Sequence, residues 1–296
     1  MINADSIKAR LKQYAQNTGH TFQEALTYYV LERTIYRICK SKYSNHFVLK
    51  GGIFLYAVFN RDYERVTTDI DFLAKRISNS SSEMKAVFKD ILSQNVDDAV
   101  IFDTESIRVE EITEFKEYHG IRVSVIGYLD KTRISVGIDI GFGDVIYPKA
   151  VKMEFPVLLD MDLPEINVYS VESAIAEKLQ AIISIGFLNS RYKDYYDIFI
   201  LSSKRSFSLF TLRNAITETF QNRHTPVPQQ FPSFLSNFMN DPIHQNRWDA
   251  FLKKKKAMIQ IPMKTVMNQI IVFTHPLFDE SFTEDAIWIP ETCSWQ

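Results

Sequence analysis

Apolar residues recur at steps of three and four over residues 6–42, which is the period of an amphipathic helix. The pattern breaks at residues 17–20, where Gly19 predicts the end of a first helix. Thr21 and Glu24 then form the Ser/Thr-x-x-Glu pattern of a capping box, which predicts the start of a second helix. We therefore expect the chain to open with two helices that cover a sheet.

Strands are predicted where apolar and polar residues alternate, because successive side chains of a strand point to opposite faces. The alternation is found at residues 69–72, 100–115, 121–128 and 133–140. The short connection at residues 130–132 predicts that the last two of these strands form an antiparallel hairpin. Residues 78–95 instead have the apolar spacing of another helix.

The second half of the chain has mainly helical patterns, beginning after Ser170, a residue suited to a helix N-cap. Further helices are expected at residues 209–220, 234–239, 246–252 and 263–273. The residues from Pro276 onward predict a loosely packed tail, which Trp288 and Trp295 could anchor. We therefore predict an α+β fold with two domains. Residues 1–166 would form a mixed sheet flanked by helices, and residues 167–296 a mainly helical C-terminal domain.

The composition is that of a folded globular protein, since 46% of the 296 residues are hydrophobic and 24% are charged. The 34 Lys and Arg residues nearly balance the 36 Asp and Glu residues, for a formal net charge of −2. The overall charge therefore does not indicate nucleic-acid binding, and any polyanion must bind to a local patch. The one strong basic run, at residues 253–256, is typical either of a solvated helix face or of a place where a phosphate backbone docks.

Cys39 and Cys293 lie far apart in the sequence and fit neither a disulfide framework nor a zinc-site spacing. Two unpaired thiols are typical of a reducing compartment, so we expect a cytoplasmic protein. The N-terminal residues lack the apolar core of a signal peptide, and no apolar run approaches the roughly 18 residues that span a membrane. The sequence leaves the oligomeric state open.

Candidate chemistry first appears at Asp69 and Asp71, which alternate with apolar residues and so share one face of the predicted strand. Their spacing along a strand is roughly 7 Å. Like charges so placed repel unless a cation lies between them, which predicts a divalent metal site. Asp139 lies opposite the apolar face of the strand at residues 133–140 and is a third candidate metal ligand.

A glycine pair precedes this strand in the segment Lys50-Gly51-Gly52, which runs into an apolar helix. Taken alone the pair is typical of a plain turn. Glycines at the N-terminus of a helix also let backbone N–H groups approach an anion closely. The connection that follows contains Arg65 and Thr68, whose guanidinium and hydroxyl could lie beside the acidic strand.

A second candidate set lies in the C-terminal half. Lys178 falls on the apolar stripe of its predicted helix, so it either reaches outward to solvent or pairs with a buried anion. Arg191 and Lys193 lie in the segment that leads into the next predicted helix. Asp194 and Asp197 share one face of that helix. These residues form either a surface ion network or part of a nucleotide pocket.

Three segments together resemble the AbiEii/AbiGii toxin family of nucleotidyltransferases, and the resemblance covers roughly residues 20–275. The segments are LKGGIFL (49–55), RVTTDIDFL (65–73) and EKLQAIISIGFLNSRYKDYYDIFIL (177–201). The order of glycine pair, helix and Asp-x-Asp strand is also that of the superfamily that contains DNA polymerase beta. The resemblance implies a nucleotidyltransferase-type core in the first domain. It also implies a toxin of a toxin–antitoxin or phage-defence module with a cognate antitoxin.

The same resemblance implies a role for each matching residue. Lys50, Gly51 and Gly52 would form the phosphate loop, and Asp69 and Asp71 would hold magnesium, or manganese in its place. Lys178 would contact the triphosphate, and Asp194 would be a further catalytic carboxylate. Many relatives have Ser or Thr directly after the glycine pair, whereas this chain has Ile53, so that hydroxyl contact is missing or is supplied by Thr67 or Thr68.

Our leading hypothesis is transfer of a nucleoside monophosphate from an NTP to an acceptor hydroxyl, with tRNA or another RNA as acceptor. Arg191 would join Lys178 in neutralising the leaving pyrophosphate. Asp139 or Asp194 would be the general base, and the sequence leaves that choice open. We expect the active site to lie between the two domains. Two alternatives remain: a toxin that binds nucleotide without transferring it, and a metal-dependent hydrolase.

Overall fold

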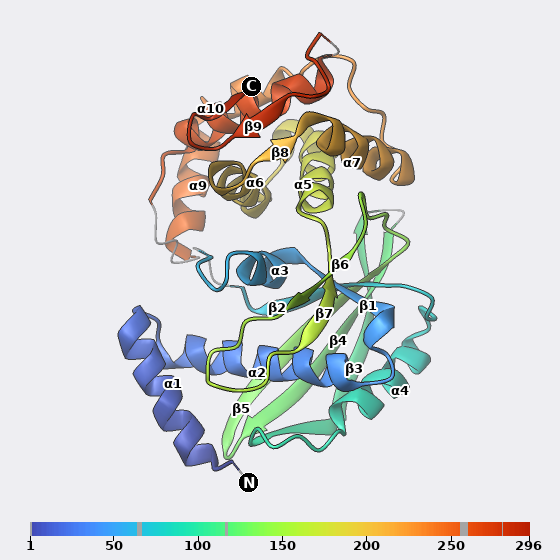
Figure 1. Ribbon diagram of the computed structural model, residues 1–296, viewed down its shortest axis with the longest axis vertical. Helices are drawn as coiled ribbons and strands as arrows, with labels where there is room; N and C mark the ends of the chain where they lie inside the picture. Colours follow the sequence, from blue (N-terminus) through green and yellow to red (C-terminus); the bar gives the residue numbers. More distant parts are fainter. Residues whose placement is uncertain (1, 64–66, 116–117, 255–259, 280) are drawn as a thin grey trace. The chain divides into compact units, whose positions relative to one another are not determined.

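The computed structural model describes residues 2–63, 67–115, 118–254, 260–279 and 281–296. The chain forms two compact units (Figure 1). The first unit contains Met1–Gly143 and Val151–Tyr169, and the second contains Asp144–Ala150 and Ser170–Gln296. Within the second unit, Arg223 forms an ion pair with Asp144 at 3.0 Å, and the backbone N–H of Tyr147 donates to Ser173 at 2.8 Å. These contacts attach residues 144–150 to the second unit, although the chain returns to the first unit after them.

A seven-stranded mixed sheet forms the centre of the first unit, with the spatial order β3-β4-β5-β2-β1-β7-β6. Its strands are β1 (Phe47–Lys50), β2 (Asp69–Ala74), β3 (Val100–Phe115), β4 (Tyr118–Leu129), β5 (Thr132–Phe142), β6 (Val151–Glu154) and β7 (Glu165–Val168). The β2–β5 and β1–β7 pairs are parallel, and the other neighbouring pairs are antiparallel. β4 and β5 form the predicted hairpin, and the sheet confirms the predicted α+β class.

The helices of the first unit are α1 (Ala4–Thr18), α2 (Phe22–Lys40), α3 (Gly51–Val58) and α4 (Ser81–Leu92). The predicted boundaries are confirmed, since Gly19 ends α1 at φ 73° and both bonds of the Thr21–Glu24 capping box are present. Figure 1 shows α2 running across the sheet. A Cβ added to Gly127 of β4 would lie 3.2 Å from Val30 on α2, so the missing side chain lets the helix approach the strand closely.

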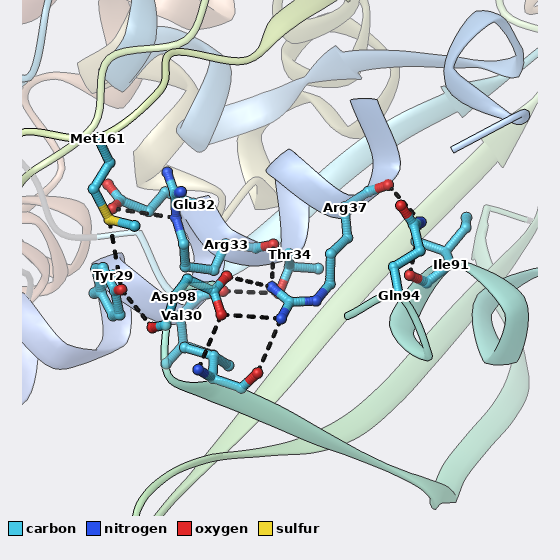
Figure 2. A network of polar contacts seen from close by, with 11 residues as sticks. Tyr29, Val30, Glu32, Arg33, Thr34, Arg37, Ile91, Gln94, Asp98 and Met161 are labelled. Carbon is cyan, nitrogen blue, oxygen red and sulfur yellow. Dashed lines mark hydrogen bonds and ion pairs between the residues drawn. The ribbon is translucent and has the colours of Figure 1, made fainter. Parts of the chain in front are cut away.

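A buried ion pair links α2 to the start of β3 (Figure 2). The Arg37 guanidinium donates to both carboxylate oxygens of Asp98, at 2.6 and 3.0 Å, and to the carbonyl oxygen of Val100 at 2.9 Å. Asp98 also accepts from the backbone N–H of Val100, and its own carbonyl accepts from the Tyr29 hydroxyl. Arg37 is 2% exposed and Asp98 is fully buried, so each charge depends on the other for compensation.

Glu32 is a second buried acid of α2, with only 3% of its surface exposed. One carboxylate oxygen accepts from the backbone N–H of Leu158 at 2.8 Å, whereas Oε1 makes no hydrogen bond and lies 3.7 Å from the Arg33 guanidinium. Burial raises the pKa of Glu32 to about 8, although Arg33, the bond from Leu158 and Arg61 lower it. We infer that Glu32 is largely protonated near neutral pH.

Replacing Glu32 with glutamine is expected to remove a pH dependence of stability. The unfolded carboxyl ionises with a pKa of about 4.5 and the folded one at about 8, so the wild type loses stability as pH rises through that window. The difference in free energy of unfolding between Glu32→Gln and the wild type should shift in favour of the variant by about 3 kcal/mol from pH 5 to pH 8. Urea unfolding at both pH values measures this gain.

The control for this experiment is Glu165→Gln. Glu165 is 60% exposed and forms an ion pair with Lys152 on the surface of the first unit. Its variant should follow the wild-type pH trend closely, because exposed pairs contribute little to stability. A Glu32→Gln curve parallel to the wild type would show that Glu32 ionises normally in the folded protein.

The second unit is mainly helical, with a small three-stranded sheet in the order β10-β9-β8. Its elements are α5 (Val171–Ile185), α6 (Tyr192–Lys204), β8 (Phe207–Ser208), α7 (Leu209–Asn222), α8 (Phe234–Phe238), α9 (Pro242–Lys254), α10 (Met263–Thr274), β9 (Ile287–Ile289) and β10 (Ser294–Trp295), with 3₁₀ turns η2 (Gly186–Leu188) and η3 (His275–Phe278). Ser170 caps α5 as predicted, accepting from the backbone N–H of Ser173. Among the described helices, none combines the length and apolar character needed to cross a bilayer.

The C-terminal tail is anchored by Trp288 and Trp295, which is the alternative that the sequence left open to a loosely packed tail. Trp288 is fully buried and donates its indole N–H to the carbonyl of Ser202 at 2.6 Å, while β9 pairs with both β8 and β10. Trp295 stacks on Phe273 of α10 with ring centroids 5.7 Å apart. Short strands far apart in the sequence carry too few residues for alternation to reveal them, and packing of the two tryptophans stabilises them instead.

Candidate functional site

β2 presents two aspartates on one face of the central sheet. Asp69 and Asp71 are both partly exposed, whereas Ile70 and Phe72 between and after them are fully buried. This burial pattern confirms that the aspartates share a face opposite the apolar residues. Asp71 lies opposite Lys50 of β1 on one side and opposite Asp139 of β5 on the other. The sheet register therefore places three carboxylates and a lysine around one region.

Both carboxylates lie against glycines. Gly51 begins α3 with φ 69°, and a Cβ added there would lie 2.0 Å from Asp71 Oδ2. A Cβ added to Gly137 of β5 would lie 2.9 Å from Asp69 Oδ1. A plain turn, the alternative predicted for the glycine pair, would require only the left-handed conformation of Gly51. It does not explain why Gly51 also leaves room for the Asp71 carboxylate. The N-terminus of α3 thus directly adjoins Asp71.

Replacing Gly51 with alanine should displace the Asp71 carboxylate. The control is Gly19→Ala, because Gly19 also has a positive φ, of 73°, but has no atom within 4 Å of an added Cβ. Both variants pay the backbone cost of about 1 kcal/mol, and only Gly51→Ala also moves the aspartate. We expect Gly51→Ala to reduce nucleotide transfer at least about a hundredfold and Gly19→Ala to keep it. Equal activity of the two variants would contradict this role of Gly51.

Asp139 is held by an arginine that sequence reasoning missed. Arg122 of β4 lies opposite Asp139 in the hairpin, and its Nε and Nη2 each donate to one carboxylate oxygen at 2.7 Å. The hydrogen bonds that Arg122 donates to Asp139 raise the pKa of Arg122. Burial opposes this, and the charges of Asp139, Asp69 and Asp71 add to it. A two-residue turn in the predicted hairpin places Arg122 opposite Asp139. The hairpin register was therefore the sequence signal that could have identified Arg122 as the partner of Asp139.

The first unit offers a partial ligand set for magnesium. Within the described residues, no group of three or more His, Cys, Asp or Glu side chains is arranged to hold a metal ion. Asp69 and Asp71 nevertheless fit the way Mg²⁺ usually binds, through one or two carboxylates with water and substrate phosphates completing its shell. Arg122 occupies both oxygens of Asp139, so the role of Asp139 as a metal ligand stays a prediction.

The predicted residues of the phosphate loop and its surroundings lie in the same unit. The Lys50 ammonium lies 5.1 Å from the centre of the Tyr169 ring, and Gly52 is buried in the first turn of α3. The Thr68 hydroxyl donates to Asp69 Oδ2 at 3.2 Å. Arg65 lies outside the described residues.

Lys178, Arg191 and Asp194 come together in the second unit. Lys178 Nζ on α5 lies 3.2 Å from Asp194 Oδ1 and 2.6 Å from Asp197 Oδ2 on α6. Arg191 Nε donates to Asp194 Oδ2 at 2.6 Å. Asp194 is 1% exposed and Asp197 fully buried, whereas the Lys178 side chain is 12% exposed. Lys178 therefore pairs with buried anions, and the group is not a solvated surface network.

The electrostatics of this group favour an ionised Asp194. Burial raises the pKa of its carboxyl, but Lys178, Arg191 and Lys193 together lower it by more, so the pKa lies below its usual value. Asp197, which was predicted only as a member of the ion network or nucleotide pocket, accepts the shorter of the two bonds from Lys178. The spacing of Asp194 and Asp197 on one helix face was the signal for this shared partner.

A separate groove of about 1110 Å³ in the second unit contains none of the predicted site residues. It is lined by parts of α7, η3 and residues 227–231. Its arginine, Arg213, donates to the carbonyl oxygens of Pro276, Asp279 and Phe282, so the guanidinium holds a loop in place. The acidic residues of β2 and the Lys178 group are therefore the better candidates for catalytic chemistry.

The family model described as "Nucleotidyl transferase AbiEii toxin, Type IV TA system" matches residues 33–265. This chain belongs to the AbiEii family. The matched range includes every predicted site residue of both units. Membership identifies the chain as a nucleotidyltransferase toxin and confirms the resemblance seen in its motifs.

Two solved structures share the fold of this AbiEii-family chain. One is a proposed nucleotidyltransferase from H. pylori, with a TM-score of 0.52 and 16% sequence identity, covering 87% of this chain and 97% of that protein. The other is JHP933 from Helicobacter pylori, with a TM-score of 0.50 and 15% identity, covering 88% of this chain and 95% of that protein. At such identities the likeness concerns the fold alone. No curated protein matches the sequence.

Proposed function

We propose that this AbiEii-family protein transfers a nucleoside monophosphate from an NTP to an RNA hydroxyl, with the 3′ end of tRNA as the leading candidate. The observation that carries the proposal is the pair Asp69 and Asp71 on one face of β2, with Asp71 packed against Gly51 at the N-terminus of α3 and Asp69 against Gly137 of β5. Backbone N–H groups at that N-terminus favour phosphate, and the two carboxylates favour a divalent cation. Phosphates and cation are the two components of an NTP complex.

In this proposal the predicted residues have the following roles. Lys50, Gly51 and Gly52 bind and orient the phosphates, with Thr68 and Arg65 nearby in the sequence. Magnesium, or manganese in its place, when held by Asp69 and Asp71 would neutralise phosphate charge and polarise the phosphoryl group. Lys178 and Arg191 of the second unit would stabilise charge on the departing pyrophosphate.

The general base remains a choice between Asp139 and Asp194. Both oxygens of Asp139 accept from Arg122, and the oxygens of Asp194 accept from Lys178 and Arg191. Either carboxylate keeps lone pairs for the acceptor proton, because an ionised carboxyl group has about four acceptor positions. A base must also come within hydrogen-bond reach of the acceptor hydroxyl, and Asp139, at 22% side-chain exposure, is more accessible than Asp194, at 1%. We therefore favour Asp139.

In the cell, the proposed reaction would stop translation in the cytoplasm until a cognate antitoxin opposes it.

A second candidate function is nucleotide binding without transfer. Ile53 favours it, because this residue is 1% exposed in α3 and gives the phosphate loop no hydroxyl where many relatives have one.

A transfer assay tests the proposal. The protein is incubated with Mg²⁺, total tRNA and each labelled NTP in turn, and RNA-bound label is measured. We expect label on tRNA from at least one NTP. Nucleotide binding with no label transferred would support the second candidate, and release of free nucleotide without acceptor would indicate a hydrolase.

A further inference from the structure

Three segments of the second unit meet around a buried histidine. His244 of α9 is 4% exposed, its Nδ1 lies 2.8 Å from the Tyr192 hydroxyl of α6, and its Nε2 lies 2.9 Å from the carbonyl of Phe187 in η2. The Phe187 ring packs edge-on against His244 with centroids 5.1 Å apart. η2, the start of α6 and α9 are thereby held together as one surface.

The outer side of this junction exposes apolar and cationic side chains together. Leu188, Ile243 and Phe187 are 83%, 59% and 41% exposed. Residues 243, 247 and 254 lie on one side of α9, next to the face that buries Trp248. The α9 surface is defined by Phe187, Leu188, Lys193, Ile243, Arg247 and Lys254, and its three cations are all exposed.

The carboxylates nearest to this surface do not cancel its charge. Asp241 caps the first turn of α9 by accepting from the backbone N–H of His244, and its single negative charge is outnumbered by the three cations. Asp249 is two positions from Arg247, which places it on another side of the helix. The buried carboxylates Asp194 and Asp197 are already paired with Lys178. The α9 surface is therefore a positive patch on a chain whose formal net charge is −2.

We propose that the α9 surface binds a single-stranded segment of RNA. Cations that follow a phosphate backbone, combined with exposed aromatic side chains on which bases stack, are the features of single-strand binding sites, and Phe187 is the exposed aromatic side chain of this surface. Lys254 of this surface belongs in the sequence to the basic run at residues 253–256, which the transfer chemistry does not use.

The α9 surface also adjoins the Lys178 group within the second unit. Lys193 belongs to the surface and is one of the cations that lower the pKa of Asp194. Arg191, on the other side of Tyr192 in the sequence, binds Asp194 directly. An RNA strand on the α9 surface would thus lie beside residues proposed to act on the nucleotide. This inference rests on the proposed function only for the identity of the RNA as acceptor.

The test compares two double variants that remove equal charge from the second unit. Arg247→Ala with Lys254→Ala alters the α9 surface, and Arg205→Ala with Lys264→Ala removes one exposed arginine and one exposed lysine elsewhere. Fluorescence anisotropy measures binding of a labelled 12-nucleotide single-stranded RNA of mixed sequence without NTP, from 50 to 200 mM salt. We expect the α9 variant to bind at least about tenfold more weakly. The slope of its log affinity against log salt should fall by about 1.4.

Controls separate the competing explanations. The Arg205/Lys264 variant should keep wild-type affinity within about twofold. Leu188→Ser, which changes no charge, should weaken binding with an unaltered salt slope. Equal affinity of the two double variants, or no RNA binding by the wild type, would overturn the proposal. The proposal would also be overturned if the Arg247/Lys254 variant kept its RNA binding and lost only its binding to anionic lipid vesicles. That result would assign the surface to a membrane.

The transfer assay keeps this inference distinct from the proposed function. Label transfer to tRNA by the α9 variant with an unchanged KM for tRNA would overturn the inference and leave the function standing. RNA binding that depends on the α9 surface, in a wild type that transfers no label, would support the inference and remove the proposed function.

Discussion

Replacing Asp71 with asparagine is expected to reduce nucleotide transfer by roughly a thousandfold or more. The substitution keeps the shape of the side chain against Gly51 but removes one of two charges available to a divalent cation. Because Asp71 neighbours Asp139 across the β2–β5 pair, losing its charge also relieves repulsion, so the fold should remain intact. The rate of label incorporation measures the first effect, and urea unfolding the second.

Glu110→Gln is the matched control for this variant. Glu110 is an exposed acid of β3 that lies opposite Arg122, in the same row of the sheet as Asp139 and Asp71. Replacing Glu110 with glutamine changes the net charge by the same amount and leaves Asp69 and Asp71 unaltered. We expect Glu110→Gln to transfer nucleotide at close to the wild-type rate. An Asp71→Asn protein as active as Glu110→Gln would rule out β2 as the centre of the chemistry.

The second unit needs a different kind of variant. Lys178→Ala would leave Asp194 and Asp197 buried without their shared cation, so lost activity could reflect lost stability. Lys178→Arg retains the charge, and a large loss of transfer with an unchanged unfolding midpoint would indicate a positional role for the ammonium.

Local patterns predicted much of the fold because they depend on neighbouring residues. The capping box at Thr21 and the alternation around Asp69 and Asp71 follow from rules that span a few positions, and both are confirmed. Family membership supports the chemistry. The assignment of single residues to catalytic roles stays a prediction.

The remaining features depend on partners distant in the sequence. Arg122 binds Asp139 only through the exact hairpin register, and Asp98 meets Arg37 across 61 positions. The segment at residues 144–150 packs in the second unit because Arg223 pairs with Asp144, 79 positions away. Periodicity reports which face of an element is buried, but it does not identify the partner that compensates a buried charge.

The Arg37–Asp98 pair carries the largest expected effect on stability. Arg37→Met keeps much of the apolar volume of the side chain but leaves a fully buried carboxylate with no cation. Asp98 must then remain charged in the core or take up a proton, and removal of one partner of such a pair costs about 3–5 kcal/mol. We expect the free energy of unfolding, measured with urea near pH 7, to fall by about that amount.

Two further variants determine whether the uncompensated charge is the cause. Lys42→Ala breaks the Lys42–Asp90 pair, whose side chains are 71% and 55% exposed, and should leave the free energy of unfolding close to that of the wild type. In the double variant Arg37→Met with Asp98→Asn, the amide oxygen can still accept from the backbone N–H of Val100 while the buried charge is gone. Stability should therefore partly recover, because a neutral hydrogen-bonded group costs less to bury than an unpaired carboxylate. If the double variant were less stable than Arg37→Met alone, lost packing against Phe102 would be the main effect of removing the guanidinium, which lies 5.0 Å from that ring.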